Sequence, residues 1–145
     1  MIKKGLYLSG SIEFAKDPEG WRNKMYKALH KYYKVIIPLG DPNPPFEKTE
    51  PEYKGWIREK YIMTDMVDVV TASYFFVKFD SAVFKGAGTV SEVTAASFFG
   101  KHMVYFLDKI EEVNMPSWTL GCLANAYKVN SIEEAIEYFS NIVNK

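Results

Sequence analysis

Short, continuously apolar runs alternate with amphipathic segments along this chain, and that alternation constrains the fold more than any other feature. The apolar runs lie at residues 5–9, 35–38, 74–77 and 102–107, and a further short strand is expected near 126–129. Runs without polar alternation are typical of strands covered on both faces. The pattern therefore predicts one α/β domain over residues 1–145. It has three layers, with a mainly parallel, twisted sheet of about five strands and helices on both faces, as in Rossmann-like and flavodoxin-like folds.

Helices are predicted between these strands at residues 18–30, 53–70, 89–99 and 131–143. Asp17-Pro18-Glu19 offers an N-cap, a first-turn proline and an acid to the first helix. Gly100 is expected to cap the end of the third, and Ser131 with Glu134 forms a capping box for the last. The second has an apolar stripe made of Trp56, Met63, Met66, Val67 and Val70.

Two segments give less regular predictions. Residues 40–51 contain four prolines and are predicted to form a surface loop, long enough to border a site. Residues 116–127 are ambiguous, apart from the short strand expected near 126–129.

Composition excludes several classes of protein. The 18 basic and 18 acidic residues balance, so no net field attracts polymeric nucleic acid or an anionic membrane. The single cysteine, Cys122, rules out an intramolecular disulfide framework and a cysteine-based zinc site. The N-terminal segment lacks the apolar core of a signal peptide, and no run approaches about 20 apolar residues. We expect a soluble cytoplasmic protein without a metal ion or organic cofactor.

Three polar segments follow predicted strands and converge on one edge of the sheet. They are residues 8–12, 78–80 and 86–92. In open α/β sheets, ligands bind beyond the carboxyl ends of the strands. We therefore expect a site built from these segments.

The segment from Gly86 to Glu92 carries the most chemistry. Gly86 and Gly88 let the backbone approach a ligand, and the start of the next helix favours a negative group. Thr89 and Glu92 have the spacing of a capping box, which is one interpretation of Glu92. The other interpretation is a carboxylate at a pocket mouth, acting as nucleophile or base. The glycine pattern fits neither the dinucleotide nor the P-loop fingerprint.

The remaining candidates each have a structural and a functional interpretation. Asp65 lies at the edge of the apolar stripe, where it is either part of a solvated helix face with Asp68 or a site residue. Asp80 ends a buried strand and is either a turn former or a ligand contact. Tyr7 is either a core phenol with a bonded hydroxyl or part of the site. Gly10 and Ser11 either make a turn or present polar groups to a ligand.

Other side chains are assigned less specific roles. Trp21 and Arg22 are expected to serve packing and salt bridges, and His30 and His102 lack metal-ligand spacing. Phe14, Trp21, Tyr53 and Trp56 offer aromatic faces on which a nucleobase stacks.

Taken together, these motifs resemble the nucleoside 2-deoxyribosyltransferase-like family, which includes the 2'-deoxynucleoside 5'-monophosphate N-glycosidases. The similarity covers roughly residues 5–108. It is carried by Tyr7-Leu8-Ser9-Gly10-Ser11-Ile12, by Asp65, and by Gly86-Ala87-Gly88-Thr89-Val90-Ser91-Glu92.

The resemblance implies an enzyme that cleaves the N-glycosidic bond of 2'-deoxynucleosides or their 5'-monophosphates. Glu92 would then attack C1' of the sugar, Asp65 would hold the substrate and assist proton transfer, and Tyr7 would orient the carboxylate. The residues implied to bind substrate are Gly10, Ser11, Ile12, Asp80, Gly86, Gly88 and Thr89. The implied product is either a free sugar or a nucleoside with an exchanged base.

Two positions depart from the family pattern and bear on phosphate recognition. Glu13 and Phe14 follow Ile12, where phosphate-handling members have an arginine, and Gly86 stands where Asp or Ser is usual. Lys85 or Arg22 would have to substitute as phosphate partner.

Two alternative functions stay open. The 86–92 segment is also similar to the loop of cytokinin-activating phosphoribohydrolases, and a non-catalytic nucleotide-binding module would keep the same pocket. In each case the partner is a small nucleoside or nucleotide. The resemblance further implies a homodimer or higher homo-oligomer, with Tyr53, Trp56, Trp118 and Asn125 as candidate contributors.

Overall fold

The structure, a computed structural model, describes residues 2–38 and 43–143. Its centre is one sheet of five parallel strands in the order β2-β1-β3-β4-β5. The strands are β1 (Gly5–Gly10), β2 (Lys34–Ile36), β3 (Tyr74–Phe79), β4 (His102–Leu107) and β5 (Tyr127–Val129). The predicted parallel α/β fold is confirmed, with β3 two residues longer and β2 shorter than expected.

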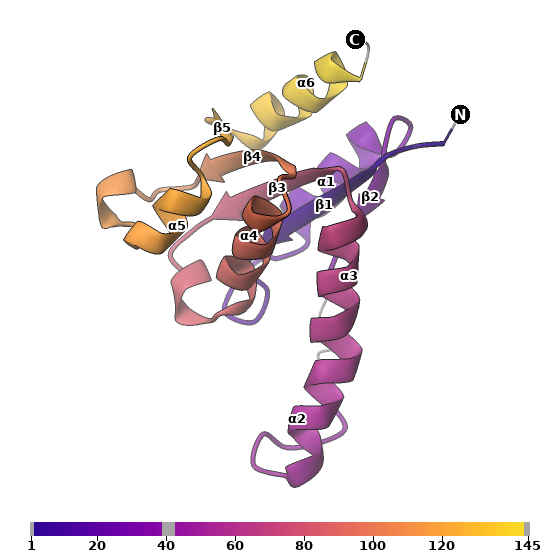
Figure 1. Ribbon diagram of the computed structural model, residues 1–145, viewed down its shortest axis with the longest axis vertical. Coiled ribbons are helices and arrows are strands. Elements are labelled where there is room, and N and C mark those ends of the chain that lie inside the picture. The colour runs from indigo at the N-terminus through magenta and orange to yellow at the C-terminus, as the bar shows by residue number, and fades with distance from the viewer. Residues whose placement is uncertain (1, 39–42, 144–145) are drawn as a thin grey trace.

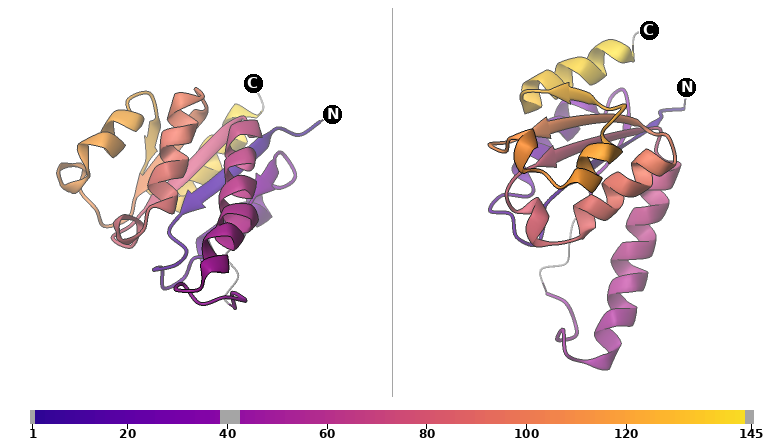
Figure 2. Two further views of the ribbon diagram at one scale, coloured as in Figure 1. Left: turned by 60° about the horizontal axis from the view of Figure 1, so that its bottom comes forward. Right: turned by 60° about the vertical axis from the view of Figure 1, so that its left-hand side comes forward.

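Helices cover both faces of this sheet (Figures 1 and 2). α1 (Gly20–Leu29) and α6 (Ile132–Ile142) lie together on one face. α3 (Met63–Thr71), α4 (Gly88–Phe98) and α5 (Ser117–Cys122) lie on the other. Within the described ranges, no helix has both the length and the apolar character needed to cross a membrane.

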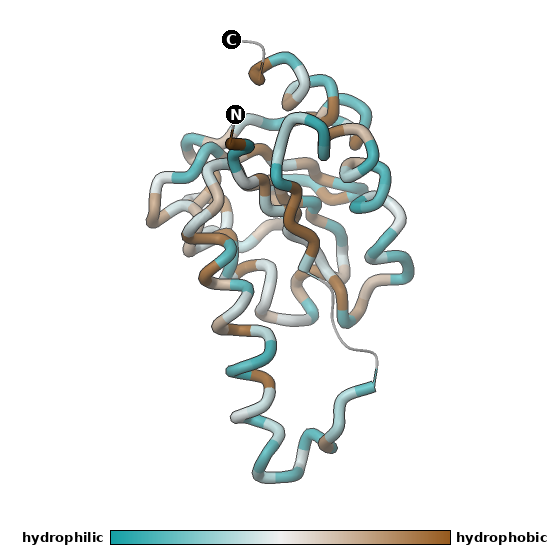
Figure 3. Tube along the Cα trace, turned by 90° about the vertical axis from the view of Figure 1, so that its right-hand side faces the viewer, coloured by the Kyte–Doolittle hydropathy of each residue, from teal (hydrophilic) through white to brown (hydrophobic). Residues whose placement is uncertain are grey.

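The strands alternate their side chains between two apolar cores. Leu6, Leu8 and Phe76 pack under α1 and α6. Tyr7 and Phe75 point the other way, toward α3 and α4, where their rings stack. The hydropathy colouring of Figure 3 accordingly shows hydrophobic segments in the middle of the molecule and hydrophilic ones along the outer helices. The alternation also fixes which β1 side chains face α4.

One long helical segment extends beyond the sheet (Figure 1). It runs through α2 (Pro51–Ile57), a π-helical turn (Arg58–Ile62) and α3. The predicted helix over 53–70 is thus present. Its predicted stripe is only partly a buried face, because Met63 and Val67 are exposed while Val69 is fully buried. The π-helical turn rotates the side chains that follow it relative to an uninterrupted α-helix.

One predicted helix start is corrected, and two predicted helix caps are confirmed. α1 begins at Gly20, and the Asp17 side chain accepts a hydrogen bond from the Gly20 N–H, so Pro18 lies outside the helix. Gly100 ends α4 with φ +66°, as expected of a C-cap glycine. Ser131 caps α6 by accepting from the Glu134 N–H. The ambiguous segment contains α5, and residues 40–42 of the predicted loop lie outside the described residues.

Candidate active site

Glu92 sits in the first turns of α4 and points at β1 rather than at its own helix start. The Tyr7 hydroxyl donates to Glu92 Oε2 at 2.5 Å, and the Ser9 hydroxyl donates to Oε1 at 2.7 Å. Tyr7 and Ser9 are two residues apart, so both face α4 from the same side of the strand. The capping-box interpretation of Thr89 and Glu92 is therefore wrong: the N-cap is Ala87, with no side-chain cap.

The surroundings of Glu92 raise its pKa to about 7. Burial is the main cause and the nearby Asp65 adds to it, while the hydrogen bonds from Tyr7 and Ser9 oppose the shift. Burial and the adjacent carboxylate raise the pKa of the Tyr7 phenol well above its usual range. The phenol is thus a permanent donor at neutral pH, and it stabilises the ionised form of Glu92.

A cavity of about 230 Å³ opens beside this carboxylate. It is lined by Gly10, Ser11, Ile12, Glu13, Phe14, Asp65, Ala82, Val83, Gly86, Ala87, Gly88, Thr89 and Glu92. These residues come from the loops after β1 and β3, from α3 and from the start of α4. Among those described, none that line the cavity is lysine, arginine or histidine.

Asp65 faces this cavity from α3, so the solvated-face interpretation is incomplete. The side chain is half-buried, and burial together with the neighbouring Asp68 raises the pKa of Asp65 to about 6. Two carboxyl groups with raised pKa values therefore line one cavity, a combination that marks candidate acid–base sites.

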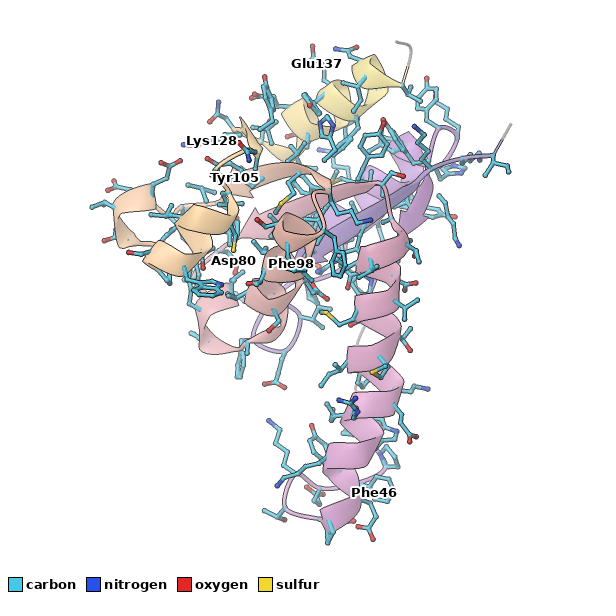
Figure 4. All side chains as sticks on the ribbon, viewed as in Figure 1. Phe46, Asp80, Phe98, Tyr105, Lys128 and Glu137 are labelled. Carbon is cyan, nitrogen blue, oxygen red and sulfur yellow. The ribbon has the colours of Figure 1, made fainter. Side chains whose placement is uncertain are left out.

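Asp80 lies behind the cavity wall rather than in it. Its carboxylate accepts from the Ser11 hydroxyl at 3.0 Å and from the Ala82 N–H at 3.0 Å, and it pairs with Lys78 at 3.1 Å. Burial acts to raise the pKa of Asp80, but the Lys78 and Ser11 contacts outweigh it and lower the pKa. Asp80, labelled in Figure 4, thus fixes Ser11 and does not line the cavity itself.

A second cavity, of about 480 Å³, adjoins the first on the α1 side of the loops. Phe14 and Ala82 line both cavities, while Trp21, Lys78, Asp80 and Lys85 line only the second. Its charged groups include Lys78, which is paired with Asp80 and with Asp108 at 3.3 Å.

The two candidate phosphate partners, Lys85 and Arg22, lie in different surroundings. Lys85 is exposed at the second cavity, whereas Arg22 is fully buried. The guanidinium of Arg22 donates to backbone carbonyl groups and not to carboxylates. The expected salt-bridge role of Arg22 is therefore wrong, and the fully buried guanidinium is not exposed at either cavity.

The other candidate aromatic residues lie away from the first cavity. On the projecting helix, the Trp56 ring contacts the rings of Tyr53 and Tyr61. Trp118 is exposed on α5 and donates to Thr94. Asn125 is exposed in the turn before β5. Of the candidate stacking residues, Phe14 alone lines the first cavity.

Ser9 contacts Glu92, and the sequence motifs assign no role to this serine. It belongs to the motif at the end of the first strand without an assigned role, yet its side chain is fully buried and its hydroxyl holds Glu92. The signal that would find it is the two-residue spacing from Tyr7. Within the described part of the chain, no group of three or more His, Cys, Asp or Glu side chains is arranged to hold a metal ion.

The fold is similar to that of a CMP N-glycosidase from Clostridium botulinum, BcmB. The TM-score is 0.60 at 17% sequence identity, and the match covers 94% of this chain and 99% of that one. At this identity the likeness establishes the fold. No protein-family model matches the chain, and no curated protein matches its sequence.

Proposed function

We propose that this protein cleaves the N-glycosidic bond of a nucleoside or nucleotide, with Glu92 as the nucleophile. The observation that carries the proposal is the buried Glu92 carboxylate, held by Tyr7 and Ser9 at the wall of a cavity that Asp65 also lines. The similar fold of a CMP N-glycosidase supports it, as does the motif resemblance to the nucleoside 2-deoxyribosyltransferase-like family.

The reaction begins with the ionised Glu92 carboxylate at C1' of the sugar. One carboxylate oxygen forms a bond to C1' while the bond from C1' to the base nitrogen breaks and its electron pair leaves with the base. The transition state resembles an oxocarbenium ion, which a neighbouring negative charge stabilises. Water, or a second base, then displaces Glu92 from C1'. With water the products are the free base and the sugar, which keeps its 5'-phosphate when the substrate is a nucleotide.

Asp65 is the proposed proton donor to the leaving base. Burial and Asp68 raise the pKa of this carboxyl to about 6, so a useful fraction stays protonated near neutral pH. An acid and a nucleophile with separately tuned carboxyl groups form a common pairing in glycoside cleavage. A proton from the attacking water then restores the acid form of Asp65.

Ser11 is proposed to contact a hydroxyl group of the sugar. Its own proton is directed at Asp80, at 3.0 Å, so the free lone pairs of Ser11 can accept from a substrate hydroxyl. The amide groups of Gly88 and Thr89, at the start of α4 beside the cavity, are proposed to bind a negative group such as a 5'-phosphate.

Base release from a substrate panel tests the proposal. Wild type, Glu92→Gln and Asp65→Asn are incubated with CMP, the other ribonucleoside and deoxyribonucleoside monophosphates, and the matching nucleosides. Chromatography then measures free base, with and without an added acceptor base. We expect release from at least one substrate by wild type, and a loss of at least about 10³-fold in Glu92→Gln.

Each result separates one function from another. Release from ribonucleotides alone supports a phosphoribohydrolase, and a new nucleoside in the presence of acceptor base supports transfer rather than hydrolysis. Binding by calorimetry without any release supports the nucleotide-binding module. Equal, negligible release by wild type and Glu92→Gln on the whole panel rejects the proposal.

A further inference from the structure

Arg22 is a fully buried cation that the proposed reaction does not use. It lies on α1, on the opposite face of the sheet from Glu92. Its Nε donates to the Leu8 carbonyl at 3.2 Å, and its Nη2 donates to the Gly10 carbonyl at 2.8 Å. Its Nη1 donates to the Pro18 carbonyl at 2.7 Å, and the guanidinium lies 4.5 Å from the Trp21 ring centre.

These contacts lie where β1 loses one of its neighbouring strands. β2 pairs with β1 only over Gly5 to Tyr7, whereas β3 pairs with it as far as Gly10. Carbonyl groups two residues apart point the same way along a strand, so Leu8 and Gly10 present theirs to one partner. The planar guanidinium takes that place with two parallel donors. It therefore fixes the last residues of β1 before the cavity.

The Leu8 and Gly10 carbonyl groups, which Arg22 binds, belong to the residues on either side of Ser9. Arg22 is thereby linked to Glu92 through Ser9. Ser9 donates to Glu92 from the other face of the strand, and Tyr7 does so two residues earlier. A small shift of the β1 end would therefore move both donors relative to Glu92. The backbone at Gly10 is closely packed, because a Cβ there would lie 2.9 Å from the Trp21 ring and 3.2 Å from the Lys78 carbonyl.

The charge of Arg22 acts on the same carboxylate. The ionisable groups that shift the pKa of Glu92 are Tyr7 on β1, Asp65 on α3 and Arg22 on α1. Of these, Arg22 is the cation, and it lowers the pKa of both Glu92 and Asp65. Among the described residues, Arg22 forms no ion pair within 4.0 Å, so its charge is not neutralised by direct contact.

We propose that Arg22 is a positioning residue that holds the end of β1, and with it Ser9 and Tyr7, against the Glu92 carboxylate, and that supplies the positive charge facing that carboxylate from behind the strand. The catalytic consequence of this arrangement rests on the proposed role of Glu92 as nucleophile. The contacts of Arg22 with the end of β1 are independent of that proposed role.

Titration of Glu92 by NMR tests the charge directly and needs no turnover. Protein labelled with ¹³C at the glutamate carboxyl is titrated, and Glu92→Gln identifies the signal. Arg22→Met and Arg22→Lys are compared with Lys24→Met, a control that removes an exposed charge from the same helix. We expect Arg22→Met to raise the pKa of Glu92 by about one unit, while Lys24→Met leaves it unchanged.

Arg22→Lys separates the charge from the hydrogen-bonding geometry. Lysine keeps the positive charge but cannot donate in parallel to Leu8 and Gly10, so we expect a near-normal pKa of Glu92 with kcat reduced about tenfold and KM little changed. Should Arg22→Met fail to fold, Arg22→Gln gives the same test of charge with a neutral side chain that still donates.

The outcomes distinguish this proposal from the proposed function. An unshifted Glu92 pKa in the neutral variants overturns the role of the charge, and wild-type kcat in Arg22→Lys overturns the role of the guanidinium geometry. If wild type releases no base from any substrate, the proposed function fails, and the NMR titration still decides whether Arg22 acts on Glu92.

Discussion

The Glu92 carboxyl group is bound by two hydroxyl groups, yet it is also removed from water and placed near Asp65. Its pKa of about 7 means that folding favours the protonated form. Between pH 4.5, its usual pKa, and pH 7 the folded protein holds a proton that the unfolded chain has released. This contribution to stability is complete below pH 4.5 and declines as the pH rises to 7.

Glu92→Gln should therefore be more stable than wild type at pH 8. Gln keeps the shape but has no charge to bury, and the gain should approach about 3 kcal/mol, the equivalent of the pKa shift. Urea denaturation at pH 5 and pH 8 measures it. The gain should shrink at pH 5, and a gain of equal size at both pH values would contradict the assigned cause.

Gly10 is expected to tolerate no side chain. Gly10→Ala places a Cβ against the Trp21 ring and the Lys78 carbonyl, and we expect a loss of about 1–3 kcal/mol in unfolding free energy. Thermal denaturation measures it. Gly121→Ala is the matched control, because a Cβ there meets no atom within 4 Å. Equal melting temperatures for the two variants would refute the steric argument.

At the level of single residues, the sequence predicts which side chains lie together better than it predicts how they are bonded. Motifs point to Glu92, Asp65 and Tyr7, and the structure brings them together. The capping-box interpretation of Glu92 fails because Thr89 and Glu92 satisfy a local spacing rule, while the partners that bind Glu92 lie more than 80 residues away. Local patterns cannot report such contacts.

Among the secondary-structure elements, the projecting helix differs most from its neighbours. α2 and the π-helical turn have no buried residue, whereas α3 buries Val69. Elements with few buried contacts open locally at a lower free energy than the core does. The far end of this helix, beside which Phe46 is labelled in Figure 4, is thus expected to open independently of the sheet.

Gly55→Ala should stabilise this helix without touching the rest of the protein. Glycine costs a helix interior about 1 kcal/mol relative to alanine, and a Cβ at this position meets no atom within 4 Å. We expect amide hydrogen exchange in α2 to slow by about fivefold. Exchange in α4 should be unchanged, and a parallel slowing there would show that the two elements open together.

Element types follow from the sequence more reliably than element ends. β4 lies where the apolar run predicts it, because a strand buried on both faces leaves a continuous signal. The predicted start of α1 is wrong by two residues, because Asp17 bonds the Gly20 N–H from outside the helix. α5 has six residues, which is too short to leave a periodic pattern.

For the whole molecule, the family resemblance predicts a homodimer or a higher homo-oligomer. α3 and α4 carry exposed apolar side chains at Met63, Val67 and Phe98, and Phe99 follows the last residue of α4. Phe98 is labelled in Figure 4. Light scattering after gel filtration should give at least twice the 16.7 kDa chain mass. Phe98→Glu should shift the mass toward the monomer, with Val113→Glu, exposed to the same 83%, as control. A monomeric wild type at high concentration would contradict the prediction.

The overall architecture is predictable because alternating strands and helices leave few arrangements open. The position of the cavity is predictable too, since strand order places the ends of β1 and β3 side by side. The contacts that hold the end of β1 behind the cavity are not predictable from the sequence. Arg22 contacts the end of β1 from α1, and no spacing of residues in the sequence predicts that contact.

Phe14 forms part of the wall that the two cavities have in common, and this residue is 46% exposed. Shortening this one side chain would widen both cavities, of about 230 and 480 Å³, and Phe14 takes no part in the hydrogen bonds that hold Glu92. The size of ligand that fits can thus be changed without changing the groups that would act on the ligand. Position 14 is therefore the natural place to redesign size selectivity.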